Sequence, residues 1–308
     1  MSDVWDDSAL TDPHAVTDKR RRVQRMFAAI APSYDLNNRL HSIWLDQAWR
    51  RRAVELARLK AGDRIVDVAC GTGDLTLAFF DYLRRHFPLA FPIAPRTHGE
   101  RDGVRGDLVP SKSDPHPNPL PGVPGKGKEP AAAQVIGIDF THEMLPIALG
   151  KWMTAASAKA LPVPSVRFIN GDAQALPLPD ACCDVVSIAF GIRNVVDPSA
   201  AAGEFFRILR PGGRVVILEF SLPTNSVFRS LYNFYLKRIL PRTATWISGD
   251  KTGAYKYLPQ SINTFIDRET MVNLLAQAGF HNIIQRPLTF GICVCYRGFK
   301  SPSTDKGS

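Results

Sequence analysis

The sequence has few of the features that mark membrane, secreted or metal-binding proteins. No apolar run approaches the roughly 18 residues that suggest a membrane span. The first residues, MSDVWDDSALTDPH, are acidic and polar, unlike a signal peptide. Only five of the 308 residues are cysteines, and no histidine-rich ligand spacing accompanies them. We therefore expect a cytoplasmic protein with reduced core cysteines and no bound metal.

Composition and charge bound the size of the domain and the kind of partner. A chain with 45% hydrophobic residues can bury a full core, so one large α/β domain is favoured over two small ones. The net charge of +9 favours an anionic partner, either nucleic acid or an acidic membrane surface. We expect disordered ends at 1–15 and 301–308, and a single domain at 16–300 that a disordered proline- and glycine-rich insertion interrupts at about 87–130.

The stretch 64–77, RIVDVACGTGDLTL, predicts a strand, a glycine turn and a helix. Its first half is a short, nearly continuous apolar run, which is typical of a strand buried on both faces of a parallel sheet. The turn Gly71-Thr72-Gly73 lets a ligand approach the backbone, and Asp74 then opens an apolar periodic segment. These features indicate the first βα unit of a doubly wound sheet, whose ligands lie beyond the carboxyl ends of the strands.

Two details around this turn favour S-adenosylmethionine over a dinucleotide. Thr76 holds the place of the third glycine in a dinucleotide fingerprint, and polar low-complexity sequence stands where an acid is expected about 20 residues later. The second strand, Gln134–Asp139, ends instead in an acid that can accept hydrogen bonds from two ribose hydroxyls. The glycine turn and Asp139 together therefore predict a nucleoside-containing cofactor.

The rest of the chain alternates between strand and helix patterns. Further strands are predicted at 166–170, 183–190 and 214–220, and a terminal hairpin at 282–286 and 292–297. Six more helices are predicted at 16–31, 46–59, 140–153, 198–209, 227–240 and 271–278. This is the arrangement of a Rossmann-like class I methyltransferase: an α/β fold whose mostly parallel seven-stranded sheet has an antiparallel C-terminal hairpin and helices on both faces.

Two surfaces of the predicted fold each have two interpretations. The helix at 16–31 carries five basic residues between Lys19 and Arg25, which form either a solvated face or a face that contacts lipid headgroups. The aromatic stripe from Phe228 to Ile239 is either core or an apolar lid beside the active site.

Five segments resemble the ubiquinone/menaquinone biosynthesis C-methyltransferases. They are IAPSYDLNNRL (30–40), DVACGTGD (67–74), FGIRNVVD (190–197), RILRPGGRVVILEFS (207–221) and ISGDKTGAYKYLPQSI (247–262). The resemblance covers nearly the whole chain outside the N-terminal tail and the insertion. It implies S-adenosylmethionine as methyl donor and a ring carbon of a prenylated quinol as acceptor. It also implies a set of cofactor contacts, namely Gly71, Thr72, Gly73, Asp139, Asp172 and Ala173.

The sequence departs from that family at two places. Some members carry a serine where Ala189 stands, so one side-chain hydrogen bond to the cofactor is absent here. The family does not normally carry so long a segment after the first helix of the sheet. Because the alanine resembles menaquinone-pathway members, we favour demethylmenaquinol over its benzoquinol analogue as the acceptor.

The mechanism that the resemblance implies needs a group that stabilises the quinol as a phenolate. Arg193, at the end of the fourth strand, is the best candidate, since a guanidinium holds a phenolate but does not act as a base. The alternative is an ion pair that only closes the loop after that strand. Tyr34, His41, Tyr232 and Tyr235 are further candidates for substrate contact or proton relay.

Other functions and partners stay open at this point. A methyltransferase acting on RNA or on another small molecule would use the basic N-terminal helix or a different cavity, and a dinucleotide oxidoreductase would use the same glycine turn. We expect a prenylated quinol partner, transient contact with the inner face of a membrane and no nucleic acid. The oligomeric state is undetermined, and a homodimer is compatible with the sequence.

Overall fold

Apolar segments of the chain form a central sheet in the computed structural model, which describes residues 4–6, 8–87, 134–159, 166–250 and 252–302. The strands are β1 (Arg64–Val68), β2 (Gln134–Asp139), β3 (Val166–Asn170), β4 (Cys183–Ala189), β5 (Leu209–Phe220), β6 (His281–Leu288) and β7 (Cys293–Phe299). Their order is β3-β2-β1-β4-β5-β7-β6. The first five strands are parallel, whereas β7 pairs antiparallel with both β5 and β6. The predicted class I methyltransferase sheet is confirmed.

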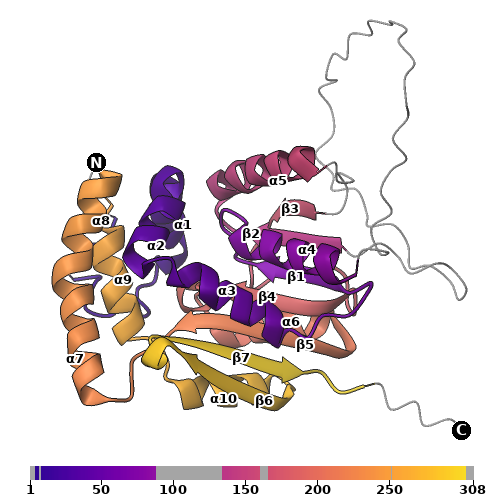
Figure 1. The fold of residues 1–308 in the computed structure, drawn as a ribbon. Coiled ribbons are helices and arrows are strands. Elements are labelled where there is room, and N and C mark those ends of the chain that lie inside the picture. Colours follow the sequence, from indigo (N-terminus) through magenta and orange to yellow (C-terminus); the bar gives the residue numbers. More distant parts are fainter. Residues whose placement is uncertain (1–3, 7, 88–133, 160–165, 251, 303–308) are drawn as a thin grey trace, which may run out of the picture.

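Helices cover both faces of the sheet and one of its edges (Figure 1). They are α1 (Lys19–Ile30), α2 (Tyr34–Ser42), α3 (Leu45–Leu56), α4 (Asp74–His86), α5 (Leu145–Lys159), α6 (Pro198–Ile208), α7 (Ser226–Phe234), α8 (Leu240–Ser248), α9 (Ala254–Asn263) and α10 (Arg268–Gln277). Helices α3, α4 and α5 bury Trp49, Phe79 and Trp152 in one core cluster. Helices α6 and α10 bury Phe205 and Met271 in a second cluster on the other face.

Successive side chains of β1 pack alternately into these two clusters. Ile65 belongs to the first cluster and Val66 and Val68 to the second, as expected when successive side chains point to opposite faces of a sheet. Both faces are covered, so the strand is apolar after its first residue, Arg64, except at Asp67. The side chain of Asp67 is buried and accepts hydrogen bonds from Thr76 (2.7 Å) and Ser187 (2.7 Å).

The remaining helices, α1, α2, α7, α8 and α9, form a cap at the carboxyl ends of the parallel strands (Figure 1). The helix predicted at 227–240 is confirmed but is longer and contains a π-helical turn: α7 ends at Phe234, the π-helical turn follows at Tyr235–Ile239, and α8 continues to Ser248. Helices α2 and α9 were not predicted, because their polar and aromatic sequences show no clean period. The helix predicted from residue 140 begins at Leu145, which places Pro146 in its first turn, where a missing N–H costs little.

The expectation of disorder at 1–15 is corrected by the packing of the described part of that segment. Trp5 is 1% exposed, stacks on Tyr257 with ring centroids 4.3 Å apart, and donates a hydrogen bond to the sulfur of Met26 (3.2 Å). Val4 and Leu10 are also buried in the cluster that the cap forms. The acidic composition of the segment hides these few apolar anchors, whose burial offsets the entropy of ordering the chain.

Two other expectations concern residues that are mostly outside the described ranges. The insertion at about 87–130 and the tail at 301–308 are described only at residue 87 and at residues 301–302. Among the described residues, no helix is both long and apolar enough to cross a membrane.

Candidate active site

The turn between β1 and α4 adopts the conformation that its glycines allow. Gly71 and Gly73 have φ values of +55° and +83°, in the left-handed region where a side chain is strained. A Cβ at Gly73 would also meet the Cβ of Ala148 at 3.1 Å. The two glycines therefore let the chain turn tightly between β1 and α4, at the carboxyl ends of the strands.

Asp139, at the end of β2, is fixed by two backbone N–H groups. Its Oδ2 accepts a hydrogen bond from the Gly71 amide (2.7 Å), and its Oδ1 accepts one from the Thr141 amide (2.7 Å). Burial raises the pKa of Asp139 to about 6, although both hydrogen bonds favour the carboxylate. Because each carboxylate oxygen has a second lone pair, Asp139 can still accept hydrogen bonds from a diol.

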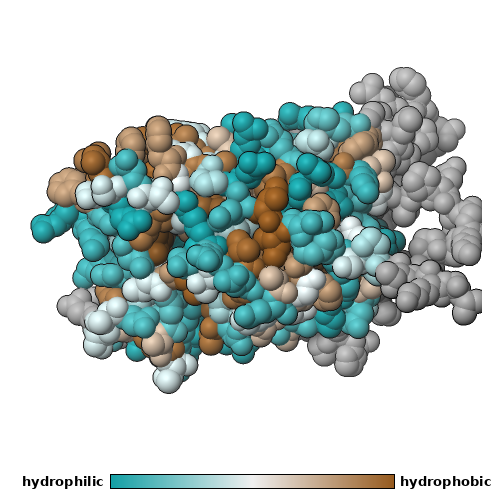
Figure 2. Space-filling view, turned by 90° about the horizontal axis from the view of Figure 1, so that it is seen from below, coloured by the Kyte–Doolittle hydropathy of each residue, from teal (hydrophilic) through white to brown (hydrophobic). Residues whose placement is uncertain are grey.

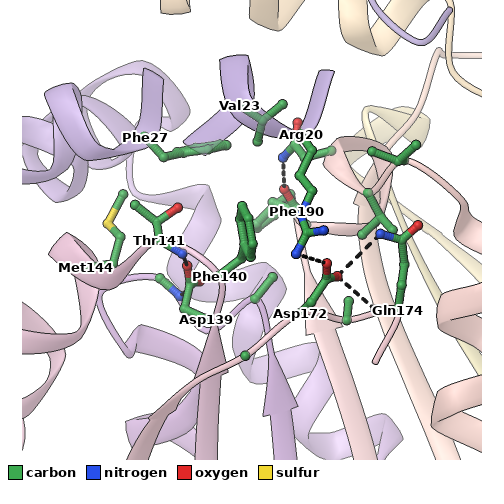
Figure 3. A pocket seen from close by; sticks show the side chains of 18 of the residues that line it. Arg20, Val23, Phe27, Asp139, Phe140, Thr141, Met144, Asp172, Gln174 and Phe190 are labelled. Atoms are coloured by element: carbon green, nitrogen blue, oxygen red, sulfur yellow. Dashed lines mark hydrogen bonds and ion pairs between the residues drawn. The ribbon is translucent and has the colours of Figure 1, made fainter. Parts of the chain in front are cut away.

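Asp172, after β3, lies across the cavity from Asp139 and is held by α1 (Figure 3). The Arg20 guanidinium forms an ion pair with its Oδ2 (2.9 Å), and the Gln174 amide donates to its Oδ1 (3.0 Å). The same guanidinium lies 4.7 Å from the centroid of the Phe140 ring. Sequence reasoning had left Arg20 on a solvent- or lipid-facing surface, because nothing in a single helix shows which residue across the fold it reaches.

These residues surround a first cavity of about 100 Å³, which we call the cofactor cavity. Gly71, Asp139, Asp172 and Ala173 all line it, so the structure brings these predicted contacts together. Ala189, where some relatives were expected to carry a serine, lines it as well.

The backbone at the rear of the cofactor cavity is strained. Ala69 and Phe190, which directly follow β1 and β4, have φ values of +51° and +57°. Such conformations cost on the order of 1 kcal/mol or more each in non-glycine residues. Both residues line the cofactor cavity, and Gly191 lets their loops approach closely, since a Cβ there would lie 2.6 Å from that of Ala69.

Thr72, which was predicted to contact the cofactor, does not line the cofactor cavity. Its hydroxyl donates to Asp35 (2.6 Å), and it accepts from the Lys151 ammonium (3.1 Å). Lys151 also pairs with Asp35 (2.5 Å) and with Asp74 (2.6 Å). Burial alone would raise the pKa of Asp74, but the charges of Arg50 and Lys151 outweigh it and hold that pKa below its ordinary value. Sequence reasoning missed this network, because its members come from α2, α4 and α5.

A second cavity, of about 360 Å³, lies against the first and is mostly apolar; we call it the acceptor cavity. Phe27, Tyr34 and Phe190 line both cavities. The four predicted catalytic candidates, Arg193, Tyr34, His41 and Tyr235, all line the acceptor cavity, as does Tyr232. Its walls come from α1, α2, α3, α7 and α9, which are distant in sequence.

Arg193 forms a buried ion pair at the wall of the acceptor cavity. Its Nη1 donates to Glu219 Oε1 (2.6 Å) and to the carbonyl of Phe190 (2.7 Å), and its guanidinium lies 5.2 Å from the centroid of the Phe220 ring. Burial would lower the pKa of Arg193, but the Glu219 charge outweighs it and raises that pKa. Its Nε is buried without a hydrogen-bond partner among the described residues. Glu219 was missed, although an acid inside the apolar run VVILEF signals a buried partner.

The other candidates already have partners in this arrangement. The ring nitrogens of His41 lie 2.9 Å from the carbonyl of Asn37 and 2.8 Å from the hydroxyl of Thr243, and the Tyr235 hydroxyl donates to the carbonyl of His41 (2.9 Å). Burial raises the pKa values of both Tyr34 and Tyr235, so each favours the neutral phenol. In the described ranges there is no group of three or more His, Cys, Asp or Glu side chains placed to hold a metal ion.

Comparison with known proteins agrees with this geometry. The family model described as the ubiE/COQ5 methyltransferase family matches residues 15–300. The chain belongs to this family. It is therefore a methyltransferase, and the two cavities lie at the ligand edge of a methyltransferase sheet.

Curated members of the ubiE/COQ5 family are similar along most of their length. A protein from Geobacter sulfurreducens named ubiquinone/menaquinone biosynthesis C-methyltransferase UbiE is 37% identical over 93% of this chain and 91% of its own. The demethylmenaquinone methyltransferase of Thermus thermophilus is 40% identical over 89% of this chain and 99% of its own. Among solved structures, a SAM-dependent methyltransferase from Thermotoga maritima shares the fold, with a TM-score of 0.51, 16% identity, and coverage of 91% and 100% of the two chains.

Proposed function

We propose that this enzyme transfers a methyl group from S-adenosylmethionine to a ring carbon of a prenylated quinol, with demethylmenaquinol as the acceptor. One observation carries the proposal: a small cavity with two carboxylates and a larger apolar cavity share Phe27, Tyr34 and Phe190 as a common wall. A bisubstrate methyl transfer needs donor and acceptor in adjacent sites. The names of the Geobacter and Thermus relatives support the quinone acceptor.

The cofactor cavity fits the two polar parts of a nucleoside. Asp139 has acceptor capacity for the ribose diol, and Asp172, across the cavity, has it for the adenine amino group. Gly71 leaves space where any side chain would obstruct, since no heavy atom lies within 4 Å of a Cβ built there. When bound, the donor supplies an electrophilic methyl group, so the protein needs no covalent intermediate.

The residues of the acceptor cavity then have three tasks. Aromatic and aliphatic walls exclude water and hold the prenylated ring, as in other largely apolar ligand sites. Arg193 provides a fixed positive charge near the ring, where it stabilises the phenolate whose charge reaches the reacting carbon. Glu219 orients that guanidinium through the 2.6 Å ion pair. A purely loop-closing role would show the same ion pair, and the variants Arg193→Gln and Arg193→Gln/Glu219→Gln separate the two roles.

The RNA alternative needs free cations on α1, and these are largely engaged. Lys19 is 2% exposed and donates to the carbonyls of Arg193 (3.1 Å) and Val195 (2.6 Å). Arg20 pairs with Asp172, and Arg22 pairs with Asp18 (2.7 Å). Three of the five basic residues are therefore used within the protein, and only Arg21 and Arg25 stay exposed without a partner among the described residues, which argues against an extended phosphate-binding face on this helix.

The test supplies reduced demethylmenaquinone in detergent together with methyl-labelled S-adenosylmethionine. We expect label in the extracted lipid as a ring C-methyl group, and only when the acceptor is reduced, because the oxidised quinone has no phenolate to push electrons to carbon. A benzoquinol analogue in parallel reports ring preference. Label on a quinol oxygen, or in RNA added to the same reaction, would contradict the proposal.

A further inference from the structure

Five apolar side chains both line the acceptor cavity and are exposed to solvent, and we call them the apolar rim. They are Ile43 (79% exposed), Leu45 (37%), Phe228 (43%), Leu231 (61%) and Phe290 (72%). They come from the α2–α3 turn, from α7 and from the turn before β7. Phe228 and Phe290 stack with ring centroids 4.8 Å apart, which joins two of these segments. The acceptor cavity therefore opens to the outside through an apolar mouth.

Helix α7 extends the apolar surface beyond this mouth. Within the described part of the chain, no residue of α7 is buried. Val227 and Phe234 are 65% and 61% exposed, and they share one helical stripe with Leu231, since the three are four and three positions apart. Figure 2, which views the molecule from below, shows apolar side chains at its left side. This is the side on which Figure 1 places α7. An exposed patch of this kind marks a surface that contacts a partner or a membrane.

The charge along α7 and α8 is of one sign. The segment 226–248 contains four basic residues and no acidic residue, and Arg229, Lys237, Arg238 and Arg242 are all exposed. The acids at the starts of α2 and α3 are already paired, Asp35 with Lys151 (2.5 Å) and Asp46 with Arg50 (2.6 Å).

This charge pattern decides whether a second copy of the chain or an anionic lipid surface docks on the apolar surface. A second copy of the chain docked through the same face would bring four cations on each side together, whereas an anionic lipid surface would neutralise them. An amphipathic helix with apolar and basic side chains is also the element that lies in the interface plane of a membrane. On the basic face of α1, the other candidate for lipid contact, three of the five basic residues are engaged within the protein, because Lys19 is buried and Arg20 and Arg22 are paired.

We propose that α7 and the apolar rim dock on the surface of an anionic phospholipid bilayer, with Val227 and Phe234 in the lipid and the basic residues at the headgroups. The acceptor then enters its cavity through the mouth directly from the bilayer, without crossing water. This inference rests on the proposed function for its lipid-dissolved acceptor. The docking itself is a property of the surface and can be measured without any substrate.

The binding test sediments the full chain with sucrose-loaded vesicles of phosphatidylcholine alone or of phosphatidylcholine with phosphatidylglycerol. We expect binding to the anionic vesicles that weakens with salt. The Val227→Ser/Phe234→Ser variant and the Lys237→Glu/Arg238→Glu variant should each lower the partition coefficient about tenfold or more. The matched control, Leu149→Ser/Met153→Ser, removes two apolar side chains of α5 that are 49% and 44% exposed. It should bind like the parent.

An activity test uses the charge variant, whose two positions do not line either cavity. Lys237→Glu/Arg238→Glu should methylate a water-soluble short-chain quinol at the parental rate and lose at least about tenfold on demethylmenaquinol embedded in anionic vesicles. Parental protein that ignores anionic vesicles but methylates detergent-solubilised demethylmenaquinol would overturn the docking and leave the proposed function standing. Vesicle binding without methylation of any quinol would overturn the proposed function and leave the docking standing. A parental dimer that the Val227→Ser/Phe234→Ser variant dissociates would also overturn the docking, because the face would then join two copies.

Discussion

The two cavities share a wall but are built by different means. The cofactor cavity is fixed by backbone: the amides of Gly71 and Thr141 hold Asp139, and strained residues such as Ala69 close its rear. The acceptor cavity is formed by side chains of helices, one of which, α7, has no buried residue within the described part of the chain. A backbone-defined site is rigid and suits one cofactor, whereas a helix-lined site open to solvent suits a long and flexible acceptor.

The largest effect should come from Arg193, at the wall of the acceptor cavity. Arg193→Gln removes the cation that stabilises the phenolate, so turnover should fall about 10²-fold or more while affinity for S-adenosylmethionine is kept. It also leaves Glu219 buried without its partner, which costs about 3–5 kcal/mol of unfolding free energy. Turnover, titration calorimetry and chemical denaturation measure the three quantities.

The Arg193→Gln/Glu219→Gln variant separates catalysis from loop closure. With both charges removed, most of the lost unfolding free energy should return, because no uncompensated charge stays buried. If Arg193 stabilises the phenolate, turnover stays low in this variant. Recovery of turnover together with stability would show that the ion pair serves only to close the loop after β4.

The next effect should appear at Asp139 and depend on pH. Asp139→Asn should weaken S-adenosylmethionine binding by about 1.5–3 kcal/mol, the scale of hydrogen bonds to a charged group. Burial sets the pKa of Asp139 to about 6, and a bound diol lowers it by favouring the carboxylate. Affinity of the parent should therefore fall as the pH drops through about 6. Calorimetry from pH 7.5 to about 5 tests this, and an equal pH dependence in Asp139→Asn would remove Asp139 from the site.

The contrast between a cofactor cavity built by backbone and an acceptor cavity lined by helices explains which parts of the site could be predicted. The turn at Gly71, the acid at Asp139 and the acid at Asp172 each lie at the end of a strand or just after it, and the carboxyl ends of parallel strands meet at one edge. Local sequence was therefore enough to bring them together. It was not enough for the hydroxyl of Thr72, which turns to Asp35 on α2, a helix without a clear sequence period.

Long-range partners account for the rest of what sequence reasoning missed. Arg20 reaches Asp172 across more than 150 positions, and the Arg193 partner Glu219 lies one strand away. Helix α9 has an internal proline, Pro259, and forms because the cap buries Tyr255 and Tyr257. Tertiary packing therefore overrides local propensity in the cap, whereas in the sheet the two agree.

A smaller effect should appear in hydrogen exchange. Amides of α7 should exchange faster than those of α4, because α7 has few buried contacts and α4 buries Phe79 and Leu83 in the core. Anionic vesicles should slow exchange in α7 and leave α4 unchanged. Equal protection of both helices in the free protein would contradict the contrast between a rigid cofactor side and a loosely held acceptor side.

The smallest effect is expected from the proline-rich stretch. Its composition predicts disorder, and loop-closure entropy grows only slowly with length. Replacing residues 88–130 with a short glycine-serine loop should leave melting temperature and turnover nearly unchanged. A large loss of either, measured by calorimetry and by methyl transfer, would show that the stretch supports one of the two cavities.

The central claim is that adjacent cavities hold donor and acceptor, and a crystal structure with S-adenosylhomocysteine and a quinone analogue tests it most directly. We expect the ribose hydroxyls at Asp139, the adenine near Asp172, and the quinone ring beside Arg193 with its prenyl chain leading to the mouth between Phe228 and Ile43. A nucleoside bound away from Asp139, or a quinone ring outside the acceptor cavity, would contradict the account.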